Sequence, residues 1–294
     1  MQRFDAVVVG AGPAGLSAAA ELSRSGSVLL IEQGPKASAR QRSVPEQVLS
    51  GVGGAGLFSD GKHPFFPAAQ ALWTLPDREA LGAAYETTAA LLRRHGIEAG
   101  PLQTTATTTT TTMPGRWQEK LYPALYVPFA ERLRCIEELW SQASAHRHAR
   151  VIGAERDGDD VVLSLVGAGS SEQVRTRAVV VATGRWSPRW IRPWLQALGA
   201  RYAFRRVEFG VRLETSSSAP LFRQLPGVDG KLRYLDVEGT EFGAPQGEEF
   251  RTFCTCREGE VVLGRAEGIA AFSGHADGPP SGRSSVALLA RSSS

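Results

Sequence analysis

The feature that most constrains the fold lies at the start of the chain. An apolar run, Val7–Val9, leads into the glycine-rich turn Gly10–Gly15, and a second run, Ser27–Ile31, ends at Glu32. A strand, a glycine-rich turn that opens a helix, a second strand and an acidic residue about twenty positions on form the layout of a dinucleotide-binding βαβ unit. The sequence therefore predicts an α/β domain with a parallel sheet built around this unit.

Each glycine of the turn has its own physical role in such a unit. Gly10 permits the tight turn, Gly12 lets the backbone approach a pyrophosphate, and Gly15 lets the helix lie close to the strand. The helix N-terminus offers free N–H groups to the phosphates. Glu32 can accept hydrogen bonds from ribose hydroxyls, and its charge repels a 2′-phosphate, which favours FAD or NAD over NADP. The residues predicted to bind the nucleotide in this segment are Gly10, Gly12, Pro13, Ala14, Gly15, Glu32 and Gln33.

A second glycine-rich segment, Gly167–Glu172, is not expected to bind a nucleotide. It lacks the third glycine and no apolar helix follows it. Because polar residues there separate two apolar runs, the segment is typical of a hairpin turn.

Composition excludes several classes of protein. The net charge of +3 comes from 33 basic and 30 acidic residues spread along the chain, which does not indicate a nucleic-acid partner. Three cysteines do not form a disulfide framework, and Cys254 and Cys256 have the wrong spacing for a CxxC redox pair or a zinc site. The first strand starts by Phe4, which leaves no room for a signal peptide, and no apolar run approaches the ~20 residues of a membrane span. We therefore expect a soluble, cytoplasmic protein without a metal site.

Periodicity predicts the remaining elements. The expected helices are 13–25, 78–95 and 128–146, the expected strands 149–156, 160–166 and 174–181, and β-rich chain follows beyond about 200. The threonine-rich stretch 104–112 is interpreted as a disordered loop, and 273–280 is also expected to be a loop.

Two further motifs carry a family resemblance. The fingerprint together with Ala182–Gly184 after a buried strand resembles the glutathione-reductase-like flavoproteins, which have two dinucleotide-binding domains. The segment Gly53–Lys62 is similar to the "GGAGxFSDGK" signature of a family of uncharacterised FAD-dependent dehydrogenases. Weaker matches follow in the order of that family at Phe209–Glu214, Arg251–Cys254, Gly259–Val262 and Ser273–His275.

The resemblance implies FAD as the cofactor and assigns residues to it. Gly10, Gly12 and Gly15 would contact the pyrophosphate and Glu32 the adenosine ribose; Arg40 would lie by the phosphates, with a solvated loop arginine as the equal alternative. The segment from Gly53, Gly54 and Ala55 to Ser59 would pass along the flavin. Thr183 and Gly184 would line the other side of the cofactor, and the backbone near Val151 would meet the adenine.

The resemblance also implies a domain organisation. A discontinuous FAD-binding domain would comprise 1–70 and 145–200, a helical insertion 71–144, and a β-rich substrate or cap domain 201–294. Flavoproteins of this class usually return to the FAD domain through a C-terminal Gly-Asp segment, which we do not find in this sequence. This leaves three interpretations open: the gene is shorter than its relatives, the chain is a fragment, or the site around the flavin ring is built in another way.

The expected activity is that of an FAD-dependent oxidoreductase, a dehydrogenase, that acts on a small organic substrate by hydride transfer to or from the flavin. Lys62 and His63 are the candidate catalytic residues, for charge stabilisation and as a base, against the alternative of surface side chains. The side chains of Trp186, Trp190 and Trp194 either pack in the core or form the wall of an aromatic substrate pocket. The alternatives are a flavin monooxygenase, a truncated non-catalytic nucleotide-binding protein that needs a partner chain, and an NAD-dependent dehydrogenase. The sequence also leaves open whether NAD(P)H serves as an external reductant and whether the chain forms a homo-oligomer.

Overall fold

The chain forms two compact units in this computed structural model. The first comprises Met1–Phe58, Phe129–Ala203 and Leu263–Ala271, and the second Ser59–Pro128, Phe204–Val262 and Phe272–Ser294. Residues 59–128 thus group with the β-rich part of the chain rather than forming a unit of their own. The residues that the structure describes are 1–66, 68, 72, 75–102, 112–113, 117–119, 122–167, 169–185, 187–203, 206–225, 229–234 and 249–293.

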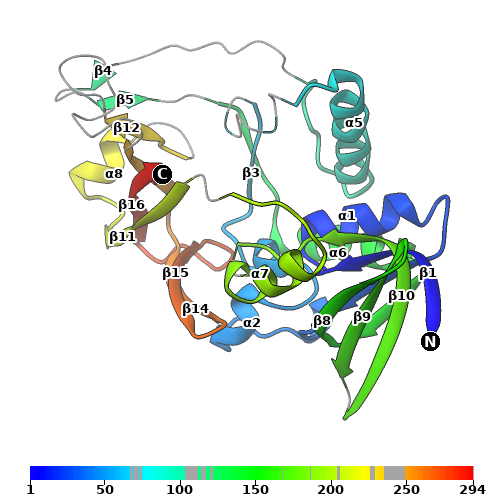
Figure 1. The fold of residues 1–294 in the computed structure, drawn as a ribbon. Coiled ribbons are helices and arrows are strands. Elements are labelled where there is room, and N and C mark those ends of the chain that lie inside the picture. The colour runs from blue at the N-terminus through cyan, green and yellow to red at the C-terminus, as the bar shows by residue number, and fades with distance from the viewer. Residues whose placement is uncertain are drawn as a thin grey trace. The chain divides into compact units, whose positions relative to one another are not determined.

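The first unit is built on a six-stranded sheet in the order β7-β2-β1-β10-β9-β8 (Figure 1). The strands β7, β2, β1 and β10 are parallel, whereas β9 and β8 join by antiparallel pairing. The strands are β1 Gln2–Val9, β2 Val28–Glu32, β7 Ala145–His148, β8 Arg150–Asp157, β9 Asp160–Gly167 and β10 Ser170–Val181. The helices are α1 Pro13–Leu22, α2 Pro45–Leu49, α3 Gly54–Leu57, α6 Phe129–Gln142 and α7 Pro188–Ala197, with a short 3₁₀ turn at Ala37–Ala39.

Alternate residues of the central strands pack into two different cores. Val8 and Leu30 lie in one cluster with Leu16 of α1 and Ile136 of α6. Val7 and Leu29 point the other way, into a cluster with β8, β9 and Ile191 and Trp194 of α7. Because both faces of these strands are covered, their near-continuous apolar sequence is that of a buried parallel sheet. The prediction of an α/β fold with a parallel sheet and a β-rich second part is confirmed.

The hairpin interpretation of the second glycine-rich segment is also confirmed. Gly167 pairs with Ser170 where β9 turns into β10. The predicted end of the helix 128–146 is wrong: α6 ends at Gln142, and residues Ala145–His148 form β7, which pairs with β2.

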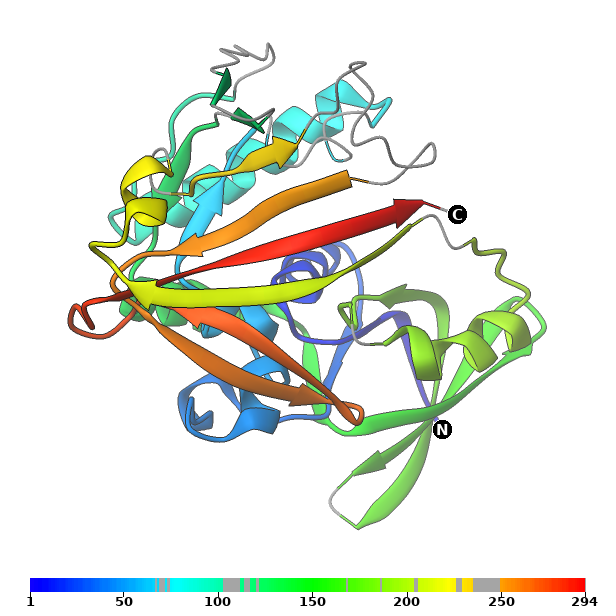
Figure 2. The same cartoon turned by 90° about the vertical axis from the view of Figure 1, so that its left-hand side faces the viewer.

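The second unit is dominated by an antiparallel sheet in the order β11-β16-β13-β12-β5-β4. Figure 2 shows β16 lying between β11 and β13. The strands of the unit are β3 Lys62–Pro64, β4 Thr112–Met113, β5 Trp117–Glu119, β6 Ala124–Tyr126, β11 Arg206–Ser216, β12 Leu232–Tyr234, β13 Glu249–Cys256 and β16 Arg283–Ser293. Its helices are α5 Arg78–Arg94 and α8 Pro220–Gln224, and the hairpin of β14 Glu260–Ala266 and β15 Ile269–His275 contributes residues to both units.

Local sequence explains where α5 begins. The side chain of Asp77 accepts a hydrogen bond from the N–H of Ala80 at 2.8 Å, which caps the helix. The predicted loop 273–280 is wrong at its start, because β15 continues through His275. The threonine-rich prediction falls largely outside the described residues, which include only Thr112 of that stretch.

Candidate functional site

A cavity of about 450 Å³ opens at the carboxyl ends of the parallel strands of the first unit. This is the edge of an open α/β sheet at which ligands bind. Its walls come from the fingerprint turn, the ends of β2 and β10, the loop before α3 and the start of β8. The lining residues are Val9, Gly10, Gly12, Pro13, Ala14, Ile31, Glu32, Gln33, Leu49, Ser50, Gly51, Gly54, Ala55, Gly56, Ala149, Arg150, Val151, Ala182, Thr183, Gly184, Arg185 and Trp190.

The three fingerprint glycines differ in what confines them. Gly10 has φ +102°, and a Cβ there would lie 2.5 Å from the carbonyl oxygen of Ala182. A Cβ on Gly15 would overlap the carbonyl oxygen of Gly10. Gly12 has an ordinary φ of −72°, and the nearest atom to a Cβ there, the Cα of Gly54, is 3.8 Å away. Gly10 and Gly15 are therefore required by the fold, whereas the chain itself leaves room beside Gly12, which faces the cavity.

Glu32 is held at the cavity wall by two backbone N–H groups. Ala11 donates to its Oε2 at 2.9 Å and Gly34 to its Oε1, also at 2.9 Å. An ionised carboxylate has about four acceptor positions, so two remain for further donors. Glu32 can therefore tie β2 to the fingerprint turn and still accept hydrogen bonds from a ribose.

The segment Gly51–Leu57, called the glycine loop below, packs directly against the fingerprint turn. Gly53 donates its N–H to the carbonyl of Ala11 at 2.7 Å, and a Cβ on Gly54 would lie 3.0 Å from the Cα of Gly12. A side chain at Gly54 would therefore push the two backbones apart. The loop brings Gly51, Gly54, Ala55 and Gly56 to the cavity wall.

The opposite wall comes from the end of β10. Ala182 donates its N–H to the carbonyl of Val9 at 2.8 Å, which fixes the chain as it leaves the sheet. The following residues, Thr183 and Gly184, line the cavity, as does Val151 of β8. Trp190 of α7 is also in the wall, while Trp194 lies in the core with its ring 4.8 Å from that of Trp190. Both tryptophans therefore take part in core packing, and their role in a substrate pocket stays a prediction; Trp186 lies outside the described residues.

Most of the predicted cofactor residues gather around this one cavity, and four described ones do not line it. Gly15, Gly53, Arg40 and Ser59 are outside the wall; the first two pack just behind it, and Ser59 belongs to the second unit. Arg40 is 7% exposed and directs its guanidinium at backbone carbonyls, so it is neither at the cavity nor solvated. The sequence reasoning missed Leu49, Ser50 and Arg150, which carry no motif and reach the wall through tertiary packing.

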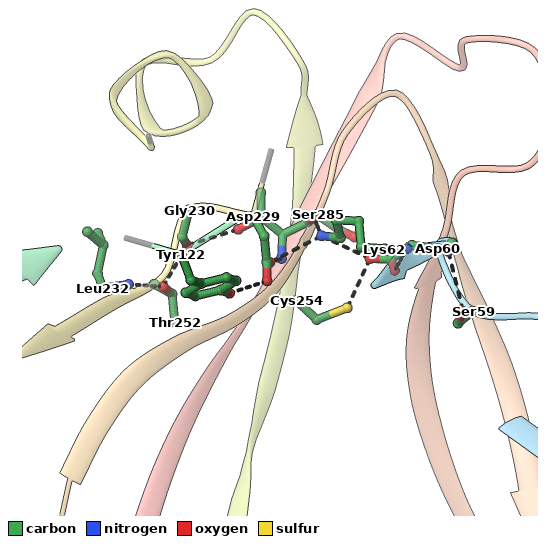
Figure 3. Close-up of polar contacts among 12 residues, drawn as sticks. Ser59, Asp60, Lys62, Tyr122, Asp229, Gly230, Leu232, Thr252, Cys254 and Ser285 are labelled. Atoms are coloured by element: carbon green, nitrogen blue, oxygen red, sulfur yellow. Dashed lines mark hydrogen bonds and ion pairs between the residues drawn. The ribbon is translucent and has the colours of Figure 1, made fainter. Parts of the chain in front are cut away.

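The candidate catalytic lysine lies in the second unit, within a buried ion-pair network (Figure 3). Its Nζ is 3.0 Å from Asp60 Oδ2 and 3.1 Å from Asp229 Oδ1, and it also donates to the carbonyl of Thr255. Tyr122 donates its hydroxyl to the other oxygen of Asp229. An ammonium has three N–H donors, and each of these three acceptors takes one.

Burial and charge act in opposite directions on this network. Burial favours the neutral form of Lys62, but the charges of Asp60 and Asp229 outweigh it and raise the pKa of the lysine. Burial likewise favours the neutral form of Asp229, yet the charge of Lys62 and the hydrogen bond from Tyr122 leave the pKa of that carboxyl below its ordinary value. Lys62 is therefore a fixed cation at neutral pH and a poor proton acceptor.

The neighbouring candidate is His63. Its Nδ1 lies 3.3 Å from the carbonyl oxygen of Gly61. Since a carbonyl only accepts, Nδ1 carries the hydrogen in this contact, and in the neutral imidazole Nε2 is then the basic nitrogen.

The part of the chain that the structure describes contains neither a metal-binding cluster nor a membrane-spanning helix. It holds no group of three or more His, Cys, Asp or Glu residues that could bind a metal ion. It also holds no helix that combines the length and the apolar character needed to cross a bilayer.

Comparison with known families shows the family and the cofactor of the chain. A family model described as FAD dependent oxidoreductase (DAO) matches residues 5–286. The chain belongs to this family. It is therefore a flavoprotein oxidoreductase with FAD as its cofactor. A search of functionally curated proteins found no match.

Solved structures similar to this DAO-family chain include several oxidoreductases. NikD, described as an unusual amino acid oxidase essential for nikkomycin biosynthesis, is 16% identical, with a TM-score of 0.46 over 98% of this chain and 69% of NikD. CabE, an aromatic hydroxylase from angucycline biosynthesis, is 17% identical, with a TM-score of 0.41 over 97% of this chain and 43% of CabE. A flavin-containing monooxygenase from Stenotrophomonas maltophilia is 22% identical, with a TM-score of 0.32 over 64% of this chain and 40% of the monooxygenase. The chain thus spans less than half the length of two of these three proteins.

The residues around the cavity fit FAD. The open side of Gly12 leaves room for a pyrophosphate, and the unused acceptor positions of Glu32 suit ribose hydroxyls. When bound, FAD supplies the capacity to take up a hydride or electrons, and the protein orients it. The chain's own contribution here is a preformed cradle built from the fingerprint turn, the ends of β2 and β10, the loop before α3 and the start of β8.

Proposed function

We propose that this protein is an FAD-dependent dehydrogenase that oxidises a small organic substrate by hydride transfer to the flavin. The observation that carries the proposal is the cavity itself, where Gly12 faces open space and Glu32 keeps acceptor positions free. The similarity of Gly53–Lys62 to the signature of FAD-dependent dehydrogenases supports the same reaction class. Within the proposal, Gly10, Gly12 and Gly15 shape the pyrophosphate site and Glu32 the ribose site.

Lys62 and His63 remain the proposed catalytic residues. Because three acceptors hold the Lys62 ammonium, its proposed role is charge stabilisation, while Nε2 of His63 is the proposed base. The second candidate function is a flavin monooxygenase. Against it, Ala182–Arg185 stands where the monooxygenase pattern has an Asp-Gly segment.

The test is anaerobic reduction of the FAD-loaded protein by a panel of small organic donors, including amines, amino acids, alcohols and 2-hydroxy acids. A dehydrogenase bleaches its flavin without oxygen and yields a product that has lost two hydrogens. The Gly12→Val variant, which we expect to lose FAD, is the matched control. Bleaching by NAD(P)H alone, with a product that gains an oxygen atom from O₂, would establish the monooxygenase instead. FAD that dithionite reduces but no donor or NAD(P)H reduces would support the non-catalytic alternative.

A further inference from the structure

Two buried arginines from different elements donate hydrogen bonds to the two ends of the glycine loop. Arg40 follows the 3₁₀ turn and is 7% exposed, and Arg132 lies on α6 and is 4% exposed. Neither is among the residues that line the FAD cavity. Their contacts explain why the fold buries two positive charges so close to it.

Every N–H of the Arg40 guanidinium is used on a backbone carbonyl. Nε and Nη2 both donate to Gln47, at 3.0 and 2.5 Å, and Nη2 also donates to Val48 at 3.2 Å. Nη1 donates to Val52 and Gly54, both at 2.8 Å. These five bonds match the five donors of a guanidinium, and they connect α2 to the glycine loop.

Neighbouring residues also pack closely against the Arg40 side chain. Its Cζ lies 4.9 Å from the centre of the Phe58 ring, and a Cβ on Gly51 would lie 2.8 Å from its Cδ. Burial lowers the pKa of Arg40 to about 10, so the side chain stays charged at neutral pH. The carbonyl dipoles therefore compensate a permanent cation, and a smaller amine could not reach all of them.

Arg132 holds the other end of the loop. Its Nη1 donates to the carbonyl of Leu57 at 2.9 Å and to that of Gly56 at 3.3 Å. These carbonyls end α3, where helix carbonyls lack partners within the helix. Arg132 thus anchors the end of the loop to α6, while Arg40 anchors its start.

The loop needs such anchors because its sequence does not order it. Gly51, Gly53 and Gly54 all have positive φ, and glycine loses more conformational entropy on ordering than any other residue. We propose that Arg40 and Arg132 are positioning residues that order the glycine loop before FAD binds. Without them the ordering cost falls on the binding step, and FAD affinity drops although neither side chain lines the cofactor's cavity.

The test compares Arg40→Lys and Arg132→Lys with a matched control, Arg134→Lys. Arg134 is two residues from Arg132 on α6 but is exposed and pairs with Glu131. FAD titration of the FAD-free proteins measures affinity, and hydrogen exchange of the same proteins measures loop order. We expect both lysine variants to bind FAD at least about 10-fold more weakly, equivalent to ~1.4 kcal/mol, and the control to bind like wild type.

A second readout separates positioning from general damage. In the variants, amide exchange should accelerate over 47–57 while β1 and β2 keep wild-type protection. The heat capacity change of FAD binding should also become more negative, because the loop then folds on binding. Wild-type affinity in both variants, or faster exchange spread evenly over β1, β2 and the loop, would overturn the proposal. If Arg40→Lys does not fold, Arg132→Lys alone carries the same test.

Discussion

The carboxylate of Glu32 accepts the N–H of Ala11 at 2.9 Å, across the end of two neighbouring parallel strands. This bond fixes the fingerprint turn relative to the residue that ends β2. Its partner bond from Gly34 fixes the chain that follows. One side chain thus shapes two walls of the FAD cavity before any ligand is bound.

We expect Glu32→Gln to weaken FAD binding and to destabilise the fold. The amide nitrogen of glutamine cannot accept, so one of the two N–H groups loses its partner in a buried place, at a cost of about 1–3 kcal/mol. Urea unfolding and FAD titration measure the two effects. Glu21→Gln is the control, because Glu21 is exposed and pairs with Arg24. Equal FAD affinity in wild type and Glu32→Gln would contradict the assigned role.

Substitution of two fingerprint glycines should give opposite phenotypes. Gly15→Ala should unfold or strongly destabilise the first unit, because its Cβ would overlap the carbonyl of Gly10. Gly12→Val should keep the fold and lose FAD, because the space beside Gly12 lies in the cavity. Thermal unfolding and flavin content, measured on the same samples, separate the two. A well-folded Gly12→Val protein with full flavin content would show that the pyrophosphate does not lie there.

Removing Lys62 should destabilise the second unit at neutral pH. Lys62→Met leaves Asp60 and Asp229 buried without their shared cation, a change that typically costs about 3–5 kcal/mol. Lys36→Met, at an exposed position, is the control. Urea unfolding curves give the difference directly. A loss no larger than that of the control would mean that the ion-pair network contributes nothing to stability.

The same network predicts a pH dependence. The folded pKa of Asp229 is below its ordinary 3.8, so its contribution to stability is present above that pH and is lost as the pH falls through the folded pKa. The folded pKa of Lys62 is above its ordinary 10.5, so its contribution is present below that pH and is lost as the pH rises through the folded pKa. The deficit of Lys62→Met should therefore be largest near neutral pH and shrink in acid, where the carboxylates become protonated. A deficit that stays constant as the pH falls from neutral to well below 3.8 would contradict this.

Cys254 should be unreactive in the folded protein. Its Sγ lies 3.1 Å from Asp60 Oδ2, and burial together with the Asp60 charge raises the pKa of the thiol to about 12. Only the thiolate reacts, so alkylation should be slow until the chain unfolds. Asp60→Asn removes the charge and should speed alkylation of Cys254, located by peptide mass mapping. Rapid modification of Cys254 in the wild-type fold would contradict the buried environment.

Sequence alone predicted the parts of the fold that local chemistry decides. The residue types of Val7–Val9, the glycines that follow and Glu32 determine their local structure, and the helix Arg78–Arg94 shows the helical period in its sequence. The continuation of β15 through His275 depends instead on pairing with β14, which no period in Ser273–His275 reveals.

For the site, too, the sequence predicted the parts that local residue patterns determine. Sequence patterns identified about half of the residues of the cavity wall, because backbone approach to a phosphate demands glycine at fixed spacing. The contact between Lys62 and Asp229 joins residues 167 positions apart, and Arg40 binds carbonyls whose positions depend on the folded loop. Neither relation leaves a signal in the residue types.

The central claim is that this chain holds FAD in the cavity beside Gly12 and Glu32. The most direct test is the visible absorption spectrum of the purified protein after incubation with FAD and removal of the excess, with the released cofactor identified by mass. We expect a two-banded flavin spectrum and the mass of FAD for the wild-type protein, and the loss of both in Gly12→Val. A colourless protein that takes up no FAD, or a variant that keeps the full spectrum, would contradict it.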